Sequence, residues 1–159
     1  MKIINENSGT VHVSKGRTPR IPYEHQIEAQ IKLNEINKKK SFSTFLVLPT
    51  GAGKTFTCVN WLLKNAVDKN KKVLWIAHRH LLLEQACEAF QTNAYSDVLI
   101  NRSSFKFRIV SGKHDHLINL KNNEDILIAS KDSLCRNLKL LDKWIEDDMY
   151  FIIDEAHHA

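Results

Sequence analysis

The chain of 159 residues has no apolar run of the roughly 18 residues that a transmembrane helix needs. Residues 1–18 are polar and lack the apolar centre of a secretion signal. The three cysteines, Cys58, Cys87 and Cys135, lie far apart and form no Cys-x-x-Cys pair. We therefore expect a cytoplasmic protein with buried free thiols, no disulfide framework and no membrane partner.

The sequence also lacks two patterns that would identify a ligand. Its histidines form the pairs His78/His80, His114/His116 and His157/His158, but none has the four-ligand spacing of a structural zinc site. Aromatic residues are not interleaved with basic ones, so no stacking platform for nucleobases is visible. The formal net charge of +5 still favours a polyanionic partner, contacted through phosphates and without sequence specificity. The lysine clusters at 38–40 and 69–72 are expected to be solvated loops.

Glycine is scarce, yet two of the five glycines fall within one three-residue window. Residues 49–55 read Pro-Thr-Gly-Ala-Gly-Lys-Thr. They follow the apolar run 43–48, which is expected to be a buried strand, and precede a helical pattern at 57–67. A glycine turn between a strand and a helix N-terminus is the setting of a phosphate-binding loop.

Each residue type in this loop has a chemical reason. Gly51 and Gly53 let backbone N–H groups turn inward, where a side chain would block a phosphate. Lys54 reaches the β- and γ-phosphates as a point charge, and the Thr55 hydroxyl ligates Mg²⁺. The general pattern has a glycine where this chain has Leu48, so the match is to its later half, and an incidental glycine turn is the alternative. The expected ATP contacts of the loop are Thr50, Gly51, Ala52, Gly53, Lys54 and Thr55.

A second apolar run, residues 150–153, ends in Asp154-Glu155. Open α/β sheets bind ligands at the carboxyl ends of their strands, so both motifs would share one edge of the sheet. Asp154 suits the shell of a Mg²⁺ ion, and Glu155 suits a general base that activates water. Without the preceding lysine loop, two surface acids at the end of a strand would be the better interpretation.

Residues 49–55 and the sequence Asp-Glu-Ala-His-His at 154–158 together resemble the first RecA-like domain of a superfamily 2 helicase or translocase of the DEAD/DEAH type. The form with two histidines looks closest to the motor subunits of restriction enzymes. The resemblance covers nearly the whole chain from Arg20 onward. It implies an α/β P-loop NTPase with a parallel sheet flanked by helices, ATP and Mg²⁺ as cofactors, and action on DNA, with RNA as the alternative.

The resemblance also suggests further sites. Gln26, within residues 21–26, matches the glutamine with which the family reads adenine. The family's nucleic-acid contacts after its second, third and fourth strands would fall on His78, Arg79, Ser111, Gly112, Ser130 and Lys131. The Ser-Gly and Ser-Lys matches are weak, because an ordinary turn and a helix cap explain them equally well.

Along the chain, the first 20 residues are expected either to be a mobile lead-in or to hold a small edge strand near 10–13, and residues 21–159 to be part of the first RecA-like domain. On the first helix, Ile27, Ile31 and Leu33 or Ile36 should face inward. The alternation of strands and helices predicts a parallel sheet. The expected helices are 23–37, 54–67, 80–92 and 131–141, and the expected strands are 43–48, 72–77, 106–110, 126–130 and 150–154.

The resemblance implies parts that this sequence does not contain. Family members continue after the Asp-Glu pair with a strand that lies between the phosphate-loop strand and the Asp-Glu strand. A second RecA-like domain, in the same chain or in a partner, then supplies arginine fingers. The sheet is therefore expected to be incomplete at its C-terminal end, and the chain to hydrolyse ATP poorly alone. The alternatives are a P-loop ATPase outside the helicases and a nucleotide-binding module without independent catalysis.

Overall fold

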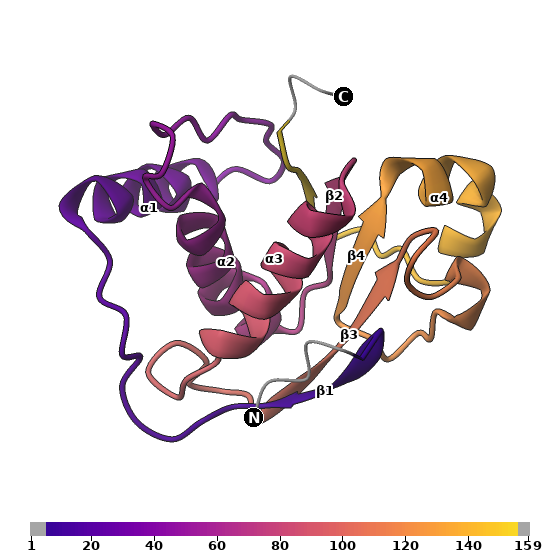
Figure 1. Cartoon of the computed structure of the whole chain (residues 1–159). Coiled ribbons are helices and arrows are strands. Elements are labelled where there is room, and N and C mark those ends of the chain that lie inside the picture. The colour runs from indigo at the N-terminus through magenta and orange to yellow at the C-terminus, as the bar shows by residue number, and fades with distance from the viewer. Residues whose placement is uncertain (1–5, 156–159) are drawn as a thin grey trace.

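The computed structural model describes residues 6–155, which form one five-stranded sheet with helices on both faces (Figure 1). The strand order is β1-β3-β4-β2-β5. Strands β3, β4, β2 and β5 run parallel to one another, and β1 is antiparallel to them, paired with β3. The predicted α/β architecture is confirmed, and β1 is the edge strand expected near the N-terminus. The strands are β1 (Ser8–His12), β2 (Val73–Ala77), β3 (Ser104–Val110), β4 (Ile126–Ser130) and β5 (Tyr150–Ile153).

Two apolar cores lie on the two faces of the sheet, under the helices that Figure 1 shows on either side of it. The larger core contains Trp75 and the buried side chains of α2 and α3, and the smaller contains Leu74 and the buried side chains of α4 and η3. Neighbouring residues of β2 thus point to opposite faces, as the strand repeat requires. The helices are α1 (Glu24–Ile36), α2 (Lys54–Asn65), α3 (His80–Thr92) and α4 (Lys131–Arg136), with single 3₁₀ turns at η1 (Val67–Lys69), η2 (Leu117–Asn119) and η3 (Leu138–Leu141).

The central strands are buried on both faces, and the edge strand β5 is not. All five residues of β4 are buried, as is usual for a parallel strand between two layers of helices. In β5 the side chains of Phe151 and Ile153 remain 57% and 53% exposed. The sheet therefore has β1 and β5 as its two edge strands, and β5 keeps apolar side chains exposed.

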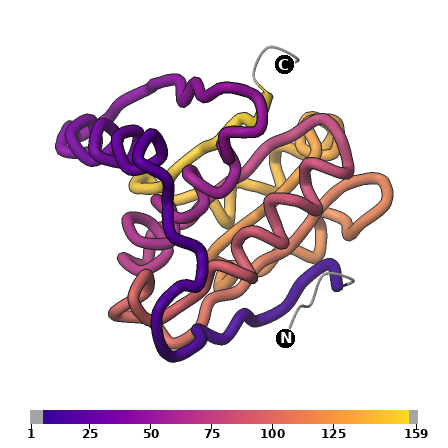
Figure 2. Tube along the Cα trace, turned by 60° about the vertical axis from the view of Figure 1, so that its left-hand side comes forward, coloured from indigo at the N-terminus to yellow at the C-terminus, as the bar shows by residue number. Residues whose placement is uncertain are grey.

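The strand expected at residues 43–48 is absent, and this prediction is wrong. The segment pairs with no strand, and its side chains Phe45 and Val47 are each 83% exposed. It loops out after α1 and returns beside the end of β5 (Figures 1 and 2). A strand needs hydrogen-bond partners for its N–H and C=O groups. Residues 6–155 contain no strand that could lie between this segment and β5 and supply them. A β-branched, apolar sequence is not sufficient without a neighbouring ladder.

The inward face predicted for the first helix holds for Leu33 but is wrong for Ile27 and Ile31. Ile27 and Ile31 are 44% and 52% exposed, and the buried residue of α1 is Gln26. Leu33 does pack, partly buried, against the larger core. The helix is therefore docked through its polar N-terminal turn, and its apolar stripe lies mostly at the surface.

Three smaller expectations also need correction. The helix expected at 131–141 ends at Arg136 and resumes as the separate turn η3. Cys87 is buried, but Cys58 is only partly buried and Cys135 is exposed. Lys72 is not solvated, because its Nζ donates a 2.8 Å hydrogen bond to the backbone oxygen of Trp144. Within the described part of the chain, no helix is both long and apolar enough to cross a membrane.

Candidate nucleotide and nucleic-acid site

The glycine loop turns the chain sharply into the first turn of α2. The N–H of Ala52 donates to the Pro49 oxygen at 3.0 Å, which closes a turn around Gly51. Gly51 and Gly53 both have positive φ, 78° and 75°, a conformation that costs other residues strain. Gly53 is the N-cap of α2, and no side chain caps this helix. The N–H groups of its first turn are therefore without helical or side-chain partners, which is the arrangement that binds phosphate.

The upstream helix α1 holds this loop through Gln26. Its Nε2 donates to the backbone oxygen of Ala52 at 2.9 Å, and its Oε1 accepts from the N–H of Tyr23 at 3.0 Å. His25 Nε2 lies 3.1 Å from the same Ala52 oxygen. Because Gln26 is only 1% exposed and uses both ends of its amide, reading adenine would require it to leave at least one of these partners.

A second contact from the same upstream segment reaches the start of α2. The guanidinium carbon of Arg20 lies 3.9 Å from the centre of the Phe56 ring, close enough for a cation–π interaction. Neither His25 nor Arg20 belongs to the loop motif, so neither was predicted to contact the loop. Residues 20–26 thus contact both the glycine loop and the start of α2.

The carboxylate pair lies close to the loop lysine. The N–H of Asp154 donates to the Ile76 oxygen at 2.8 Å, so Asp154 continues the ladder between β5 and β2. Burial and the neighbouring charge of Glu155 raise the pKa of Asp154, and the positive charge of Lys54 acts in the opposite direction. The charge of Lys54 at the start of α2 therefore acts on the acid that follows β5. The expected reason, two strands ending at one sheet edge, does not hold, because residues 43–48 are not a strand.

The thiol of Cys58 also lies within electrostatic reach of Asp154. Cys58 lies one turn beyond Lys54 on α2, and burial together with the charge of Asp154 raises the pKa of its thiol to about 12. The thiol is therefore neutral at physiological pH and adds no second negative charge beside the carboxylate. Glu155 follows with φ of 52°, an uncommon left-handed conformation for a residue other than glycine. Residues 156–158 of the motif lie outside the described residues.

The predicted nucleic-acid contacts follow three neighbouring strands. Ala77 pairs with Ser130 and Val110 pairs with Ala129, so β2, β3 and β4 end at the same edge of the sheet. The structure therefore brings the six predicted residues to one side of the molecule. Four of them are exposed and two are buried: the exposed ones are His78, Arg79, Gly112 and Lys131, and the buried ones are Ser111 and Ser130.

The two serines are occupied inside the protein. Ser130 caps α4, because its Oγ accepts from the N–H of Ser133 at 3.2 Å. Ser111 Oγ lies 3.0 Å from His80 Nδ1 and 2.6 Å from His114 Nδ1. The cap and the turn, which the sequence left open as alternatives, are therefore present. The contacts of His80 and His114 with Ser111 were not predicted from the sequence.

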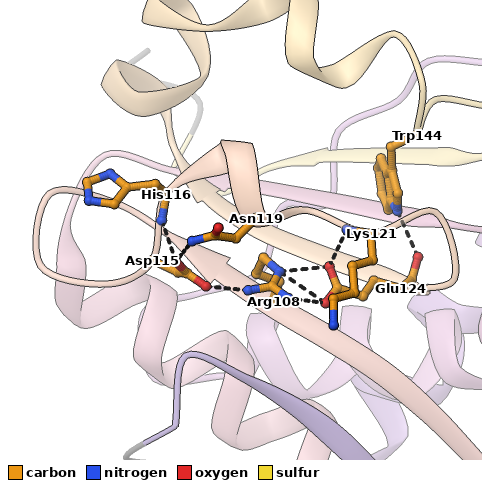
Figure 3. A network of polar contacts seen from close by, with 7 residues as sticks. All are labelled: Arg108, Asp115, His116, Asn119, Lys121, Glu124 and Trp144. Atoms are coloured by element: carbon orange, nitrogen blue, oxygen red, sulfur yellow. Dashed lines mark hydrogen bonds and ion pairs between the residues drawn. The ribbon is translucent and has the colours of Figure 1, made fainter.

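A buried ion network fixes the loop that follows Ser111 (Figure 3). Arg108 of β3 donates to Glu124 at 2.8 Å through Nε and forms an ion pair with Asp115. Asp115 also accepts from Asn119 Nδ2 at 2.6 Å, and Trp144 Nε1 donates to the backbone oxygen of Glu124 at 2.8 Å. A buried arginine is tolerated because both carboxylates compensate its charge. The network ties both ends of the loop between β3 and β4 to one side chain.

Residues 20–159 match the family model ResIII, described as "Type III restriction enzyme, res subunit". No curated protein matches the chain. The matched region includes both the glycine loop and the Asp-Glu pair, and proteins of this helicase-like type generally use ATP and Mg²⁺ and bind nucleic acid. The chain therefore belongs to the ResIII family and is an ATP-dependent, helicase-like domain with a RecA-like P-loop fold.

Proposed function

We propose that this chain binds ATP and Mg²⁺ as part of a motor that moves on DNA. The observation that supports the proposal is that the charge of Lys54, at the uncapped start of α2, acts on the carboxyl group of Asp154, which follows β5 on the ladder with β2. Lys54 would contact the β- and γ-phosphates, and Thr55 and Asp154 would hold Mg²⁺. The bound ion would neutralise charge on the phosphates, and Glu155 would accept a proton from the attacking water.

The helix α2 is suited to this role because no side chain caps its N-terminus. The N-cap Gly53 has no side chain, whereas α4 is capped by its own serine. The first N–H groups of α2 are consequently left for a ligand, and the helix dipole favours an anion there. Thr50, Gly51 and Ala52 complete the loop that would enclose the phosphates.

Nucleotide binding can be tested with two lysine variants on the same helix. Lys54→Ala removes the charge from the loop and should weaken Mg²⁺-dependent binding of a fluorescent ATP analogue about tenfold or more. Lys64→Ala removes an equally exposed lysine from the last turn of α2 and serves as the control. Equal affinities for wild type and a folded Lys54→Ala variant would refute this site.

The DNA contact is proposed for the exposed residues His78, Arg79, Gly112 and Lys131. They follow three adjacent strands, and the net charge of +5 suits a phosphate backbone. Arg79→Ala should weaken DNA binding and flatten its salt dependence by about one released counterion. Arg136→Ala, at the exposed end of α4, is the control. Parallel titrations with RNA decide between the two nucleic acids, and tighter RNA binding would overturn the DNA assignment.

A second candidate, nucleotide binding without independent catalysis, is favoured by the segment at residues 43–48. This segment leads into the glycine loop but is not anchored in the sheet. A loop attached to an unpaired segment is poorly preorganised, and preorganised charge provides most of the stabilisation of a phosphoryl-transfer transition state. The purified chain should therefore bind ATP but turn it over slowly, even with DNA. Rapid DNA-stimulated turnover by the monomeric chain would contradict this.

A further inference from the structure

The buried indole N–H of Trp75 has no hydrogen-bond partner, unlike those of the other two tryptophans. Trp61 Nε1 donates to Asn34 Oδ1 at 2.8 Å, and Trp144 Nε1 donates to the Glu124 oxygen at 2.8 Å. Trp75 is 2% exposed, and its Nε1 is the buried side-chain polar atom left unpaired among residues 6–155. An unmade buried hydrogen bond costs about 1–3 kcal/mol, so its presence in the centre of a core requires an explanation.

The register of the sheet shows what this group faces. Trp75 of β2 lies opposite Ile152 of β5, and side chains two residues apart share one face of a strand. Asp154 follows Ile152 by two residues and remains on the ladder through its bond to the Ile76 oxygen. Trp75 and Asp154 therefore lie on the same face of the sheet, beneath the first turns of α2.

The indole is held in place by packing. Its ring meets Phe90 edge-on, with centroids 6.0 Å apart and planes at 88°. The N–H approaches the carboxyl group of Asp154 and opposes the upward shift of its pKa that burial and Glu155 cause, but a hydrogen bond of normal geometry is not formed. The donor is thus desolvated and lies on the same face of the sheet as the carboxylate.

We propose that Trp75 is a positioning residue for Asp154: the indole N–H of Trp75 donates a hydrogen bond to one carboxylate oxygen when the other turns toward Mg²⁺. This inference rests on the proposed function of Asp154. Metal-binding carboxylates are usually oriented by a hydrogen bond from a neighbouring group, which fixes the rotamer.

The contact can be observed directly, because the three indole N–H groups give separate signals in a ¹H–¹⁵N spectrum of the intact chain. Trp61 and Trp144 have partners elsewhere and serve as internal controls. Without nucleotide, Asp154→Asn should shift the Trp75 signal and leave the other two in place. Addition of Mg²⁺·ATP to the wild type should shift the Trp75 signal downfield as the bond forms. A Trp75 signal that Asp154→Asn leaves unmoved would overturn the inference.

A functional test separates the donor from the packing. Trp75→Phe keeps an aromatic ring against Phe90 and removes the N–H, and it should raise the Mg²⁺ concentration needed for half-maximal nucleotide binding about tenfold. Nucleotide binding without Mg²⁺ should stay unchanged. Trp61→Phe removes a comparable indole from the neighbouring helix and should leave the Mg²⁺ dependence as it is. An unaltered Mg²⁺ dependence in folded Trp75→Phe would overturn the inference.

The two proposals fail in different ways. If wild type shows no Mg²⁺-dependent nucleotide binding, the proposed function fails, and the spectrum of Asp154→Asn still decides whether Trp75 contacts the acid. If wild type binds Mg²⁺·ATP while its Trp75 signal does not move, the proposed function stands and Trp75 has no positioning role. Should Trp75→Phe not fold, the two spectra recorded on chains that keep the tryptophan decide the matter.

Discussion

Gln26 occupies the space that a side chain at Gly53 would need. A Cβ atom at position 53 would lie 2.4 Å from Gln26 Nε2, far inside van der Waals contact. The amide therefore rests directly on the backbone of the glycine loop, in addition to its bond with Ala52. Gly53 is required here both by its positive φ and by this approach, so α1 and the loop form one interlocked unit.

Gly53→Ala is predicted to destabilise the chain and to abolish nucleotide binding. The left-handed conformation costs about 1–2 kcal/mol for a residue with a Cβ atom, and displacement of Gln26 adds to this. Thermal unfolding and binding of a fluorescent ATP analogue measure the two effects.

Gly51→Ala is the matched control for this prediction. Gly51 has a similar φ of 78°, but a Cβ there would meet nothing within 4 Å, so only the backbone strain is added. The loss of stability should therefore be smaller than for Gly53→Ala. Equal losses would show that the contact with Gln26 contributes nothing.

Gln26→Ala is predicted to reduce both stability and nucleotide discrimination. Two hydrogen bonds of a buried amide are lost, which should lower the free energy of unfolding by about 1–3 kcal/mol. If the amide also reads the edge of adenine, the preference for ATP over GTP should fall more than the affinity for the phosphates.

Gln30→Ala supplies the comparison for Gln26. Gln30 lies one turn further along α1 and bonds to Asn60 Oδ1 at 3.0 Å without touching the loop. Its removal should change stability but not the ATP/GTP ratio. An unchanged ratio in Gln26→Ala as well would restrict that residue to a structural role.

Glu155→Gln is predicted to leave nucleotide affinity nearly intact and to suppress ATP turnover. The amide has the size of the carboxylate but cannot accept a proton from water. Binding and single-turnover hydrolysis with the chain in excess over ATP should be measured, with Glu28→Gln on the exposed side of α1 as the control. Wild-type turnover in Glu155→Gln would show that another group is the base.

Asp115→Asn is predicted to change the pH dependence of the free energy of unfolding. Burial alone would raise the pKa of Asp115, but hydrogen bonds from Asn119, the His116 N–H and Arg108, together with the arginine charge, hold it below the ordinary value of 3.8. A lowered pKa in the folded state means that the contribution of Asp115 is present above that value and is lost as the pH falls through the folded pKa.

The measurement is urea unfolding of wild type and Asp115→Asn from neutral pH downward. The variant should be less stable than wild type near neutral pH, because the charge of Arg108 loses a partner. The difference should narrow below the ordinary carboxyl pKa, where wild type loses the same ion pair. A constant difference at all pH values would exclude the predicted linkage.

The sequence predicted the backbone setting of the candidate site where that setting depends on local chemistry. The glycine loop before α2 and the acid after β5 are defined by residue type and by their place at an element boundary, and the charge of Lys54 acts on that acid. Trp75 was not predicted. It lies on the same face of the sheet as Asp154 because it pairs with Ile152, two residues before Asp154. Finding it required the register between the two strands, which no local pattern contains.

The errors share a physical cause, which is that burial is decided by neighbours. Residues 43–48 have the composition of a strand but no ladder partner, and Ile27 and Ile31 form an apolar stripe with no layer above it. Gln26, a polar residue on the same helix, is buried because the glycine loop offers a carbonyl oxygen. Propensity and periodicity cannot predict which surface will be covered.

The open edge of β5 has a practical consequence for solubility. Within residues 6–155 this edge has no neighbour, and the exposed Phe151 and Ile153 belong to it, with Phe45 and Val47 exposed on the loop that returns beside it. An unpaired apolar edge is a template for strand addition by another chain, and natural proteins usually protect such edges with charge or cover. The chain in isolation is therefore expected to self-associate as its concentration rises, and a lysine in place of Phe151 should delay precipitation without disturbing the glycine loop.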